Sequence, residues 1–184
     1  MALVTDKLVY VHIYKTGGNS VRKLLPQEGK EVGGVHSCLK DVQASYKSDM
    51  PNHFKFAVVR HPYDWTYSLY TYIRRTNHGL RPIVLKQNFV EFIVYLRDHM
   101  LGQPWKHLGN NVTTMTVACE GCDKFYKLED LKKDTTQFCK DVGVRYQPLP
   151  LVNNNPDNNI PYFLEADILI QDIFADDYKT FGYE

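Results

Sequence analysis

The segment VYVHIYKTGGNSVRKLL, residues 9–25, places a lysine, two hydroxyl side chains and two adjacent glycines between a β-branched run and a helical pattern. Glycines let backbone N–H groups approach a ligand, and the first N–H groups of a helix have no acceptor within the helix. Lys15 adds a mobile positive charge, and Thr16, Asn19 and Ser20 add polar side chains. The segment therefore predicts a site for a phosphate or a similar anion. The alternative is a plain strand–turn–helix corner with a solvated lysine, and the loop does not have the GxxxxGK[ST] pattern of nucleotide-binding loops.

A second segment, FKFAVVRHPYDWTYSLY (54–70), places Arg60 at the end of a β-rich run and Ser68 in the helical pattern that follows. An arginine at the carboxyl end of a strand, followed by helix N–H groups and a hydroxyl, is suited to bind a phosphate. The alternative is a surface arginine packed over Tyr63 and a serine that only caps the helix. Taken together, two anion sites at the ends of consecutive strands predict a ligand with phosphates at both ends.

The elements that must position these residues follow an alternating order. Strand patterns at 7–14 and 54–60, a weaker one at 112–118 and a short one at the start of 124–131 alternate with helical patterns. The helical patterns lie at 20–27, 37–47, 64–75 with Asp64 as N-cap, 89–100, from the later part of 124–131 up to Gly143, and 161–183. The ranges 27–37 and 76–88 read as loops. Strands alternating with helices predict an α/β fold with a central, mostly parallel sheet flanked by helices. A length of 184 residues without internal repeats predicts a single domain, 1–184.

Composition limits the function classes. A net charge of +1 argues against a protein that tracks nucleic-acid phosphates. The chain has neither a secretory leader pattern at its start nor an apolar stretch of the ~18 residues that span a bilayer, so we expect a cytoplasmic protein with no membrane span. Cys119 and Cys122 have the spacing of half a zinc site or of a redox pair, but no second pair follows. Free thiols are therefore the expectation, and pairing or metal binding stays open.

The two anion segments together resemble the PAPS-dependent sulfotransferases, closest to the heparan sulfate and other carbohydrate O-sulfotransferases. YKTGGNSVRKLL is similar to the 5′-phosphosulfate loop of that family, and FAVVRHPYDWTYSLY is similar to its 3′-phosphate motif. KFYKLEDLKKDTTQFCKDVGV and FADDYKTFGY are similar to two further segments, so the resemblance follows nearly the whole chain in order. Tyr14 stands where the family usually has Pro, and Asn19 stands where it usually has Thr. The lysine and both glycines are retained.

The resemblance implies a P-loop-like sulfotransferase fold and an enzyme. It would transfer the sulfuryl group of 3′-phosphoadenosine 5′-phosphosulfate (PAPS) in line to an acceptor hydroxyl, such as that of a carbohydrate, and release adenosine 3′,5′-bisphosphate. Lysine and arginine would supply the positive charge, so no metal is expected. The implied donor-binding residues are Lys15, Thr16, Gly17, Gly18, Asn19, Ser20, Arg60 and Ser68. Lys15 would stabilise the leaving phosphate.

His36 is the candidate general base. A histidine titrates near neutral pH, and GVHSCLKDV resembles the segment that carries the catalytic histidine in some heparan sulfotransferases. The alternative is a loop histidine that only packs. His12, within the expected first strand, reads as a core histidine instead.

Two other function classes are open from the sequence: a non-catalytic PAP- or PAPS-binding module, and an ATP-using nucleotide kinase. Arg22 fits either a phosphate contact or a solvated face. The aromatic residues of 63–72 fit a core or a stacking surface. Arg74, Arg75 and Arg81 fit an anionic acceptor or a solvated face, and the Asn-rich segment 153–159 fits a lid. The acceptor and the oligomeric state are open.

Overall fold

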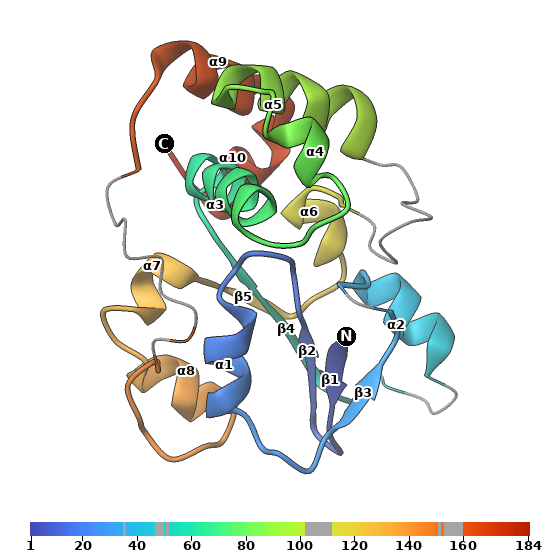
Figure 1. The fold of residues 1–184 in the computed structure, drawn as a ribbon. Helices are drawn as coiled ribbons and strands as arrows, with labels where there is room; N and C mark the ends of the chain where they lie inside the picture. Colours follow the sequence, from blue (N-terminus) through green and yellow to red (C-terminus); the bar gives the residue numbers. More distant parts are fainter. Residues whose placement is uncertain (35, 47–49, 51, 102–111, 151, 153–159) are drawn as a thin grey trace. The chain divides into compact units, whose positions relative to one another are not determined.

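The chain divides into two compact units in the computed structural model, which describes residues 1–34, 36–46, 50, 52–101, 112–150, 152 and 160–184 (Figure 1). Unit 1 comprises Met1–Arg60 and Val117–Asn154, and unit 2 comprises His61–Thr116 and Asn155–Glu184. The single domain expected from chain length stays a prediction.

Unit 1 holds a five-stranded sheet in the order β3-β1-β2-β4-β5. Its strands are β1 (Ala2–Val4), β2 (Leu8–Val11), β3 (Lys30–Val32), β4 (Phe54–Val59) and β5 (Lys124–Lys127). β4 pairs in parallel with both β2 and β5, whereas β1 runs antiparallel to both β2 and β3. All strands but β1 therefore run in one direction. The sheet is mixed and mostly parallel, which confirms the prediction of an α/β fold with a mostly parallel sheet.

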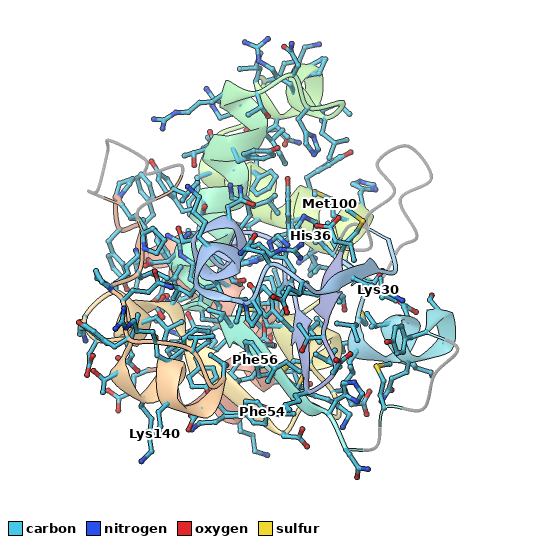
Figure 2. The ribbon with its side chains drawn as sticks, turned by 90° about the horizontal axis from the view of Figure 1, so that it is seen from below. Lys30, His36, Phe54, Phe56, Met100 and Lys140 are labelled. Atoms are coloured by element: carbon cyan, nitrogen blue, oxygen red, sulfur yellow. The ribbon has the colours of Figure 1, made fainter. Side chains whose placement is uncertain are left out.

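The core of unit 1 lies between one sheet face and three short helices. Helices α1 (Gly18–Leu24), α7 (Leu128–Leu131) and α8 (Thr136–Asp141) contribute apolar side chains to the same buried cluster as β2 and β4. Because side chains alternate along a strand, Phe54 and Phe56 share a face of β4, and their rings stack at 5.7 Å (Figure 2). Helix α2 (Leu39–Ser45) also belongs to unit 1.

Unit 2 is helical, with α3 (Pro62–Arg75), α4 (Arg81–Val84), α5 (Phe89–Tyr95), the π-helical turn η1 (Leu96–Met100), α9 (Leu164–Ile173) and α10 (Ala175–Phe181). Tyr63 and Trp65 of α3 are buried, whereas Tyr72 is exposed. The core interpretation of the aromatic residues is therefore confirmed for the first two and wrong for Tyr72. The Tyr63 hydroxyl donates to the Pro161 carbonyl at 2.9 Å.

Two helix starts differ from the predictions. The segment predicted as a strand at 112–118 forms helix α6 (Met115–Ala118) instead. The buried carboxylate of Asp177 accepts hydrogen bonds from the N–H groups of Met115 and Thr116, at 3.0 and 2.7 Å, which satisfies donors at the start of a helix. Asp64 is not the N-cap of α3. The helix begins at Pro62, whose fixed φ suits the first helical turn, and His61 is the N-cap.

Other element boundaries also differ from the predictions, because of strand pairing or because of a break in a helix. The first predicted strand ends at Val11, so His12 lies beyond it. The predicted loop 27–37 contains β3, because its backbone pairs with β1, and the predicted loop 76–88 contains α4. The long C-terminal helix is divided at Phe174, where the backbone leaves the helical conformation.

Candidate anion-binding site

The loop between β2 and α1 is held by its own backbone. Lys15 has a φ of 60° and Gly17, the N-cap of α1, has a φ of 77°. The buried hydroxyl of Thr16 donates to the Ile13 carbonyl at 2.9 Å, and the N–H groups of Ser20 and Val21 donate to the Gly17 carbonyl. The Thr16 hydroxyl therefore helps to fix the loop, and its predicted contact with a ligand stays a prediction.

The loop presents backbone donors. Gly17 is the N-cap of α1 and Gly18 and Asn19 are its first residues, so their N–H groups have no acceptor within the helix. N–H groups at this position in a strand–loop–helix segment are suited to bind an anion. Asn19 is exposed, and Ser20 is buried with its Oγ accepting from the Val152 N–H at 3.2 Å.

The two glycines have a packing role that the sequence did not indicate. A Cβ at position 17 would lie 2.7 Å from Cδ1 of Leu128, and a Cβ at position 18 would overlap the ring of His12. Gly17 also has a positive φ, which side-chain-bearing residues rarely adopt. The glycines therefore let α1 approach its neighbours in unit 1, in addition to exposing the loop backbone.

Arg60 brings a second cation to this loop. It follows the last residue of β4, and β4 is the parallel neighbour of β2. Its Nη1 donates to the carbonyl of Lys15 at 3.4 Å. Burial, together with the charge of Arg60, lowers the pKa of Lys15 to about 8. Two positive charges are thus held at the carboxyl ends of adjacent parallel strands, where α/β sheets commonly bind ligands.

His36 lies beside the same loop. Its ring centroid is 4.4 Å from that of Tyr14 and 4.7 Å from that of His12. Its Nδ1 lies 3.1 Å from the His12 carbonyl oxygen, which only accepts, so Nδ1 carries the hydrogen and Nε2 carries the lone pair. Burial lowers the pKa of His36 to about 4, so the ring is neutral at pH 7.

Lys15 and His36 also share a backbone property. In the described part of the chain, they are the two non-glycine residues with positive φ, at 60° and 61°. A side-chain-bearing residue in this region costs roughly 1 kcal/mol, and such strain is concentrated at functional sites. The structure therefore brings Lys15, Thr16, Gly17, Gly18, Asn19, Ser20, Arg60 and His36 together in unit 1.

Ser68 is not among these residues of unit 1. It is in α3, which belongs to unit 2. Its predicted contact with the phosphate that Arg60 would bind stays a prediction.

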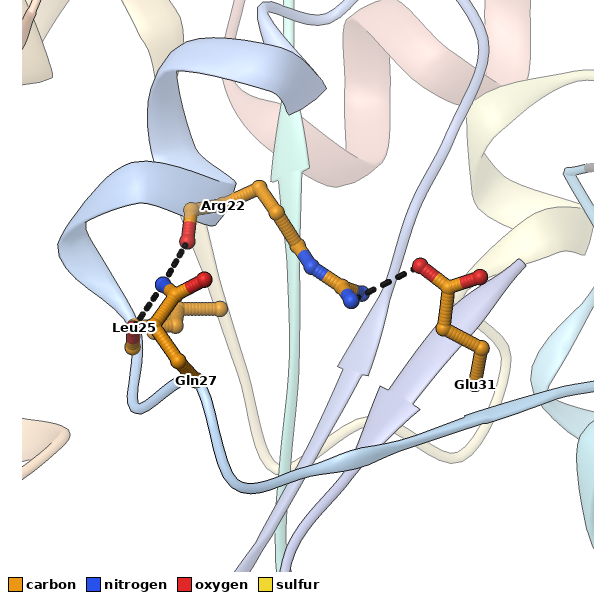
Figure 3. A network of polar contacts seen from close by, with 4 residues as sticks. All are labelled: Arg22, Leu25, Gln27 and Glu31. Atoms are coloured by element: carbon orange, nitrogen blue, oxygen red, sulfur yellow. Dashed lines mark hydrogen bonds and ion pairs between the residues drawn. The ribbon is translucent and has the colours of Figure 1, made fainter.

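The structure shows partners for two arginines, Arg22 and Arg74, whose roles the sequence left open. Arg22 Nη2 forms an ion pair with Oε1 of Glu31 in β3 at 2.7 Å (Figure 3). In the same figure, the amide of Gln27 donates to the carbonyls of Arg22 and Leu25, which ends α1. In unit 2, Arg74 donates to the carbonyl of Val84 at 3.0 Å and so satisfies an acceptor at the C-terminal end of α4. Both guanidinium groups therefore have structural partners.

The sequence indicated only a core histidine at position 12, but His12 also contacts His36 and Gly18. Its carbonyl orients His36, its ring occupies the space above Gly18, and burial lowers its pKa to about 3. The signal available in the sequence was the alternation of Tyr10, His12 and Tyr14, which places three rings on one side of an extended segment.

The cysteine pair forms a turn. Cys38, Cys119, Cys122 and Cys139 are not in disulfides, and the N–H of Cys122 donates to the carbonyl of Cys119 at 2.9 Å. Burial, with the neighbouring Cys119, raises the pKa of Cys122 to about 12. Within the described residues, no three His, Cys, Asp or Glu side chains are grouped to hold a metal ion. Nor does this part of the chain contain a helix of the length and apolarity needed to cross a membrane. The lid expected at 153–159 lies outside the described residues.

Comparisons with protein-family models, curated protein sequences and solved structures find no match to the chain. Two cations, backbone donors and a neutral imidazole around one loop are able to bind an anion and to accept a proton beside it.

Proposed function

We propose that the protein is a sulfotransferase that moves the sulfuryl group of PAPS to an acceptor hydroxyl. The observation that carries the proposal is the arrangement of Lys15, Arg60 and His36 around the loop after β2. The sulfur–oxygen bond to the 5′-phosphate would break as the acceptor oxygen bonds to sulfur, and the acceptor proton would pass to His36. This order of events needs a cation at the leaving phosphate and a base at the acceptor.

The loop residues fit the phosphosulfate end of the donor. The N–H groups of Gly17, Gly18 and Asn19 and the ammonium of Lys15 would hold it, and negative charge that develops on the leaving oxygen would be stabilised by Lys15. Arg60, and by resemblance Ser68, would hold the 3′-phosphate. A guanidinium binds phosphate with two parallel N–H groups, which aims the donor as well as attracting it.

His36 fits the role of base through its tautomer. The hydrogen on Nδ1 is held by the His12 carbonyl, which leaves the lone pair of Nε2 to accept a proton. The pKa of about 4 makes the free imidazole a weak base. The charge of Lys15 is among the causes of that lowering, so an anion bound at Lys15 would raise the pKa of His36 toward the range in which general bases work.

A non-catalytic PAP- or PAPS-binding module is the second candidate, and the lowered pKa of His36 favours it. Both candidates bind adenosine 3′,5′-bisphosphate through Lys15 and Arg60. Only the enzyme transfers the sulfuryl group.

Binding is tested by calorimetry with adenosine 3′,5′-bisphosphate and with ATP. We expect the bisphosphate to bind more tightly, and Lys15→Met and Arg60→Gln each to weaken it by about tenfold or more, because each removes a charge-assisted contact. Lys23→Met and Arg22→Gln are the matched controls: Lys23 is exposed on α1, and Arg22 pairs with Glu31. Tight ATP binding without a preference for the bisphosphate would remove both candidates and favour the kinase.

Transfer is tested with labelled PAPS and a panel of glycans, phenols and lipids. We expect label in one acceptor class and a loss of about 10²-fold or more in rate for His36→Gln, the usual size of a general-base contribution. His53→Gln, at the position directly before β4, is the control. Bisphosphate binding without transfer to any acceptor would leave the binding module as the function. Transfer by His36→Gln at the parent rate would show that another group is the base.

A further inference from the structure

Charge is segregated along the chain of unit 2. Every charged side chain between Tyr72 and Asn88 is basic, and every charged side chain between Tyr162 and Tyr178 is acidic. The first segment runs from the end of α3 through α4, and the second contains α9. The net charge of the chain is therefore near zero although two of its segments carry strong local charges of opposite sign.

Large apolar side chains are exposed in the same two places. Ile83 and Leu85, in the basic segment, are 42% and 44% exposed, and Leu164 and Ile168, in the acidic segment, are 64% and 59% exposed. Leu164, Ile168 and Asp172 are spaced four residues apart, so they share one side of α9. Apolar side chains rimmed by charge are typical of protein–protein contact surfaces.

We define two faces from these residues. The basic face comprises Tyr72, Arg81, Ile83, Leu85 and Lys86, and the acidic face comprises Tyr162, Leu164, Glu165, Ile168 and Asp172; all ten residues are exposed. α4 packs against α3, whereas α9 packs against α3 and α5, and α4 and α9 lie apart from one another in Figure 1. The two faces therefore cannot cover each other within one copy of unit 2.

We propose that the protein self-associates, with the acidic face of one copy docked on the basic face of another. Each face carries what the other lacks, an opposite charge around exposed aliphatic and aromatic side chains, so a second copy fits both. When both contacts form at once, the result is a closed pair with twofold symmetry. The inference does not depend on the proposed sulfotransferase activity, because none of the ten residues belongs to the anion-binding site.

Sedimentation velocity over a range of protein concentrations tests the association. The average mass of the parent protein is expected to increase with concentration above the monomer mass of 21.4 kDa. At about 0.5 M salt it is expected to return to the monomer mass, because salt screens exposed charges. A limiting mass of two copies indicates a closed pair, and continued growth indicates a head-to-tail chain. Both outcomes support contact between the two faces. A parent protein that stays monomeric at every concentration overturns the proposal.

Charge reversal tests which faces meet. Arg81→Glu/Lys86→Glu and Glu165→Lys/Asp172→Lys are each expected to weaken association by about tenfold or more, because like charges then face each other. An equimolar mixture of the two variants is expected to associate again, since the reversed basic face of one copy complements the reversed acidic face of the other.

The matched control is Lys132→Glu/Lys140→Glu, at exposed positions of unit 1. It makes the same change in charge as Arg81→Glu/Lys86→Glu, and Lys140 is labelled in Figure 2. It is expected to associate like the parent. Ile168→Ser, at an exposed position, provides a variant without a charge change and is also expected to weaken association. A mixture that fails to restore association, or a control that weakens it as much as the face variants do, overturns the pairing of the two faces.

Discussion

The lowered pKa of Lys15 predicts how nucleotide binding changes with pH. Lys15 binds an anion in its protonated form, so affinity falls as pH rises through the pKa of about 8. At this pKa the charged fraction of Lys15 falls from roughly 76% at pH 7.5 to roughly 9% at pH 9, which raises the Kd for adenosine 3′,5′-bisphosphate about eightfold. A lysine at the ordinary pKa of 10.5 would lose only about 3% of its charge by pH 9.

Calorimetry at pH 7.5, 8, 8.5 and 9 provides the measurement. The phosphates of the ligand are almost fully ionised in this range, because their second pKa is about 6. Lys15→Arg is the control, since arginine stays charged throughout, and its Kd should change little with pH. Subtracting its profile removes the contribution of every other group that titrates. A parent Kd that is flat between pH 7.5 and 9, or a parent profile equal to that of Lys15→Arg, refutes the reasoning.

Three further predictions concern stability. Gly18→Ala should lower the free energy of unfolding by about 1–3 kcal/mol in urea titrations, although Ala normally favours a helix, because the new methyl group overlaps the ring of His12; a neutral or stabilising result contradicts this packing. His12 and His36, whose pKa values are lowered to about 3 and about 4 from 6.5, bind protons more readily when unfolded, so the free energy of unfolding should fall as pH drops from 6.5 toward 4. His12→Gln should reduce that slope by up to about 1.4 kcal/mol per pH unit, and an unchanged slope would show that His12 does not contribute. Asp177→Ala should lower the free energy of unfolding by about 2–4 kcal/mol in thermal unfolding, because it removes the acceptors of the buried Met115 N–H and the partly buried Thr116 N–H at the start of α6. Asp176→Ala, at an exposed position, should lower it by less than about 0.5 kcal/mol; equal effects would contradict the capping role.

Local sequence patterns were enough to predict those parts of the fold that depend mainly on neighbouring residues in the chain. The buried run that became β4 is apolar on both faces except at Lys55, and the helical spacing at 89–100 is confirmed by α5 and η1. In the same way, the two glycines and Lys15 marked the loop after β2, because glycine at a strand end indicates a backbone turn by itself. These signals depend on neighbours in sequence, so they can be read without the fold.

Contacts distant in sequence decided the rest. The segment 112–118 is helical at its end because Asp177 caps it from more than sixty positions away, and 30–32 is a strand because β1 supplies its partner. Likewise, no pattern could indicate that His12 would pack on Gly18, that its carbonyl would set the tautomer of His36, or that Arg60 would reach the Lys15 carbonyl. The sequence by itself determined which residue types carry charge and where the backbone can turn. Only the tertiary structure decided their desolvation and their partners, because burial and hydrogen bonding arise when separate segments of the chain meet.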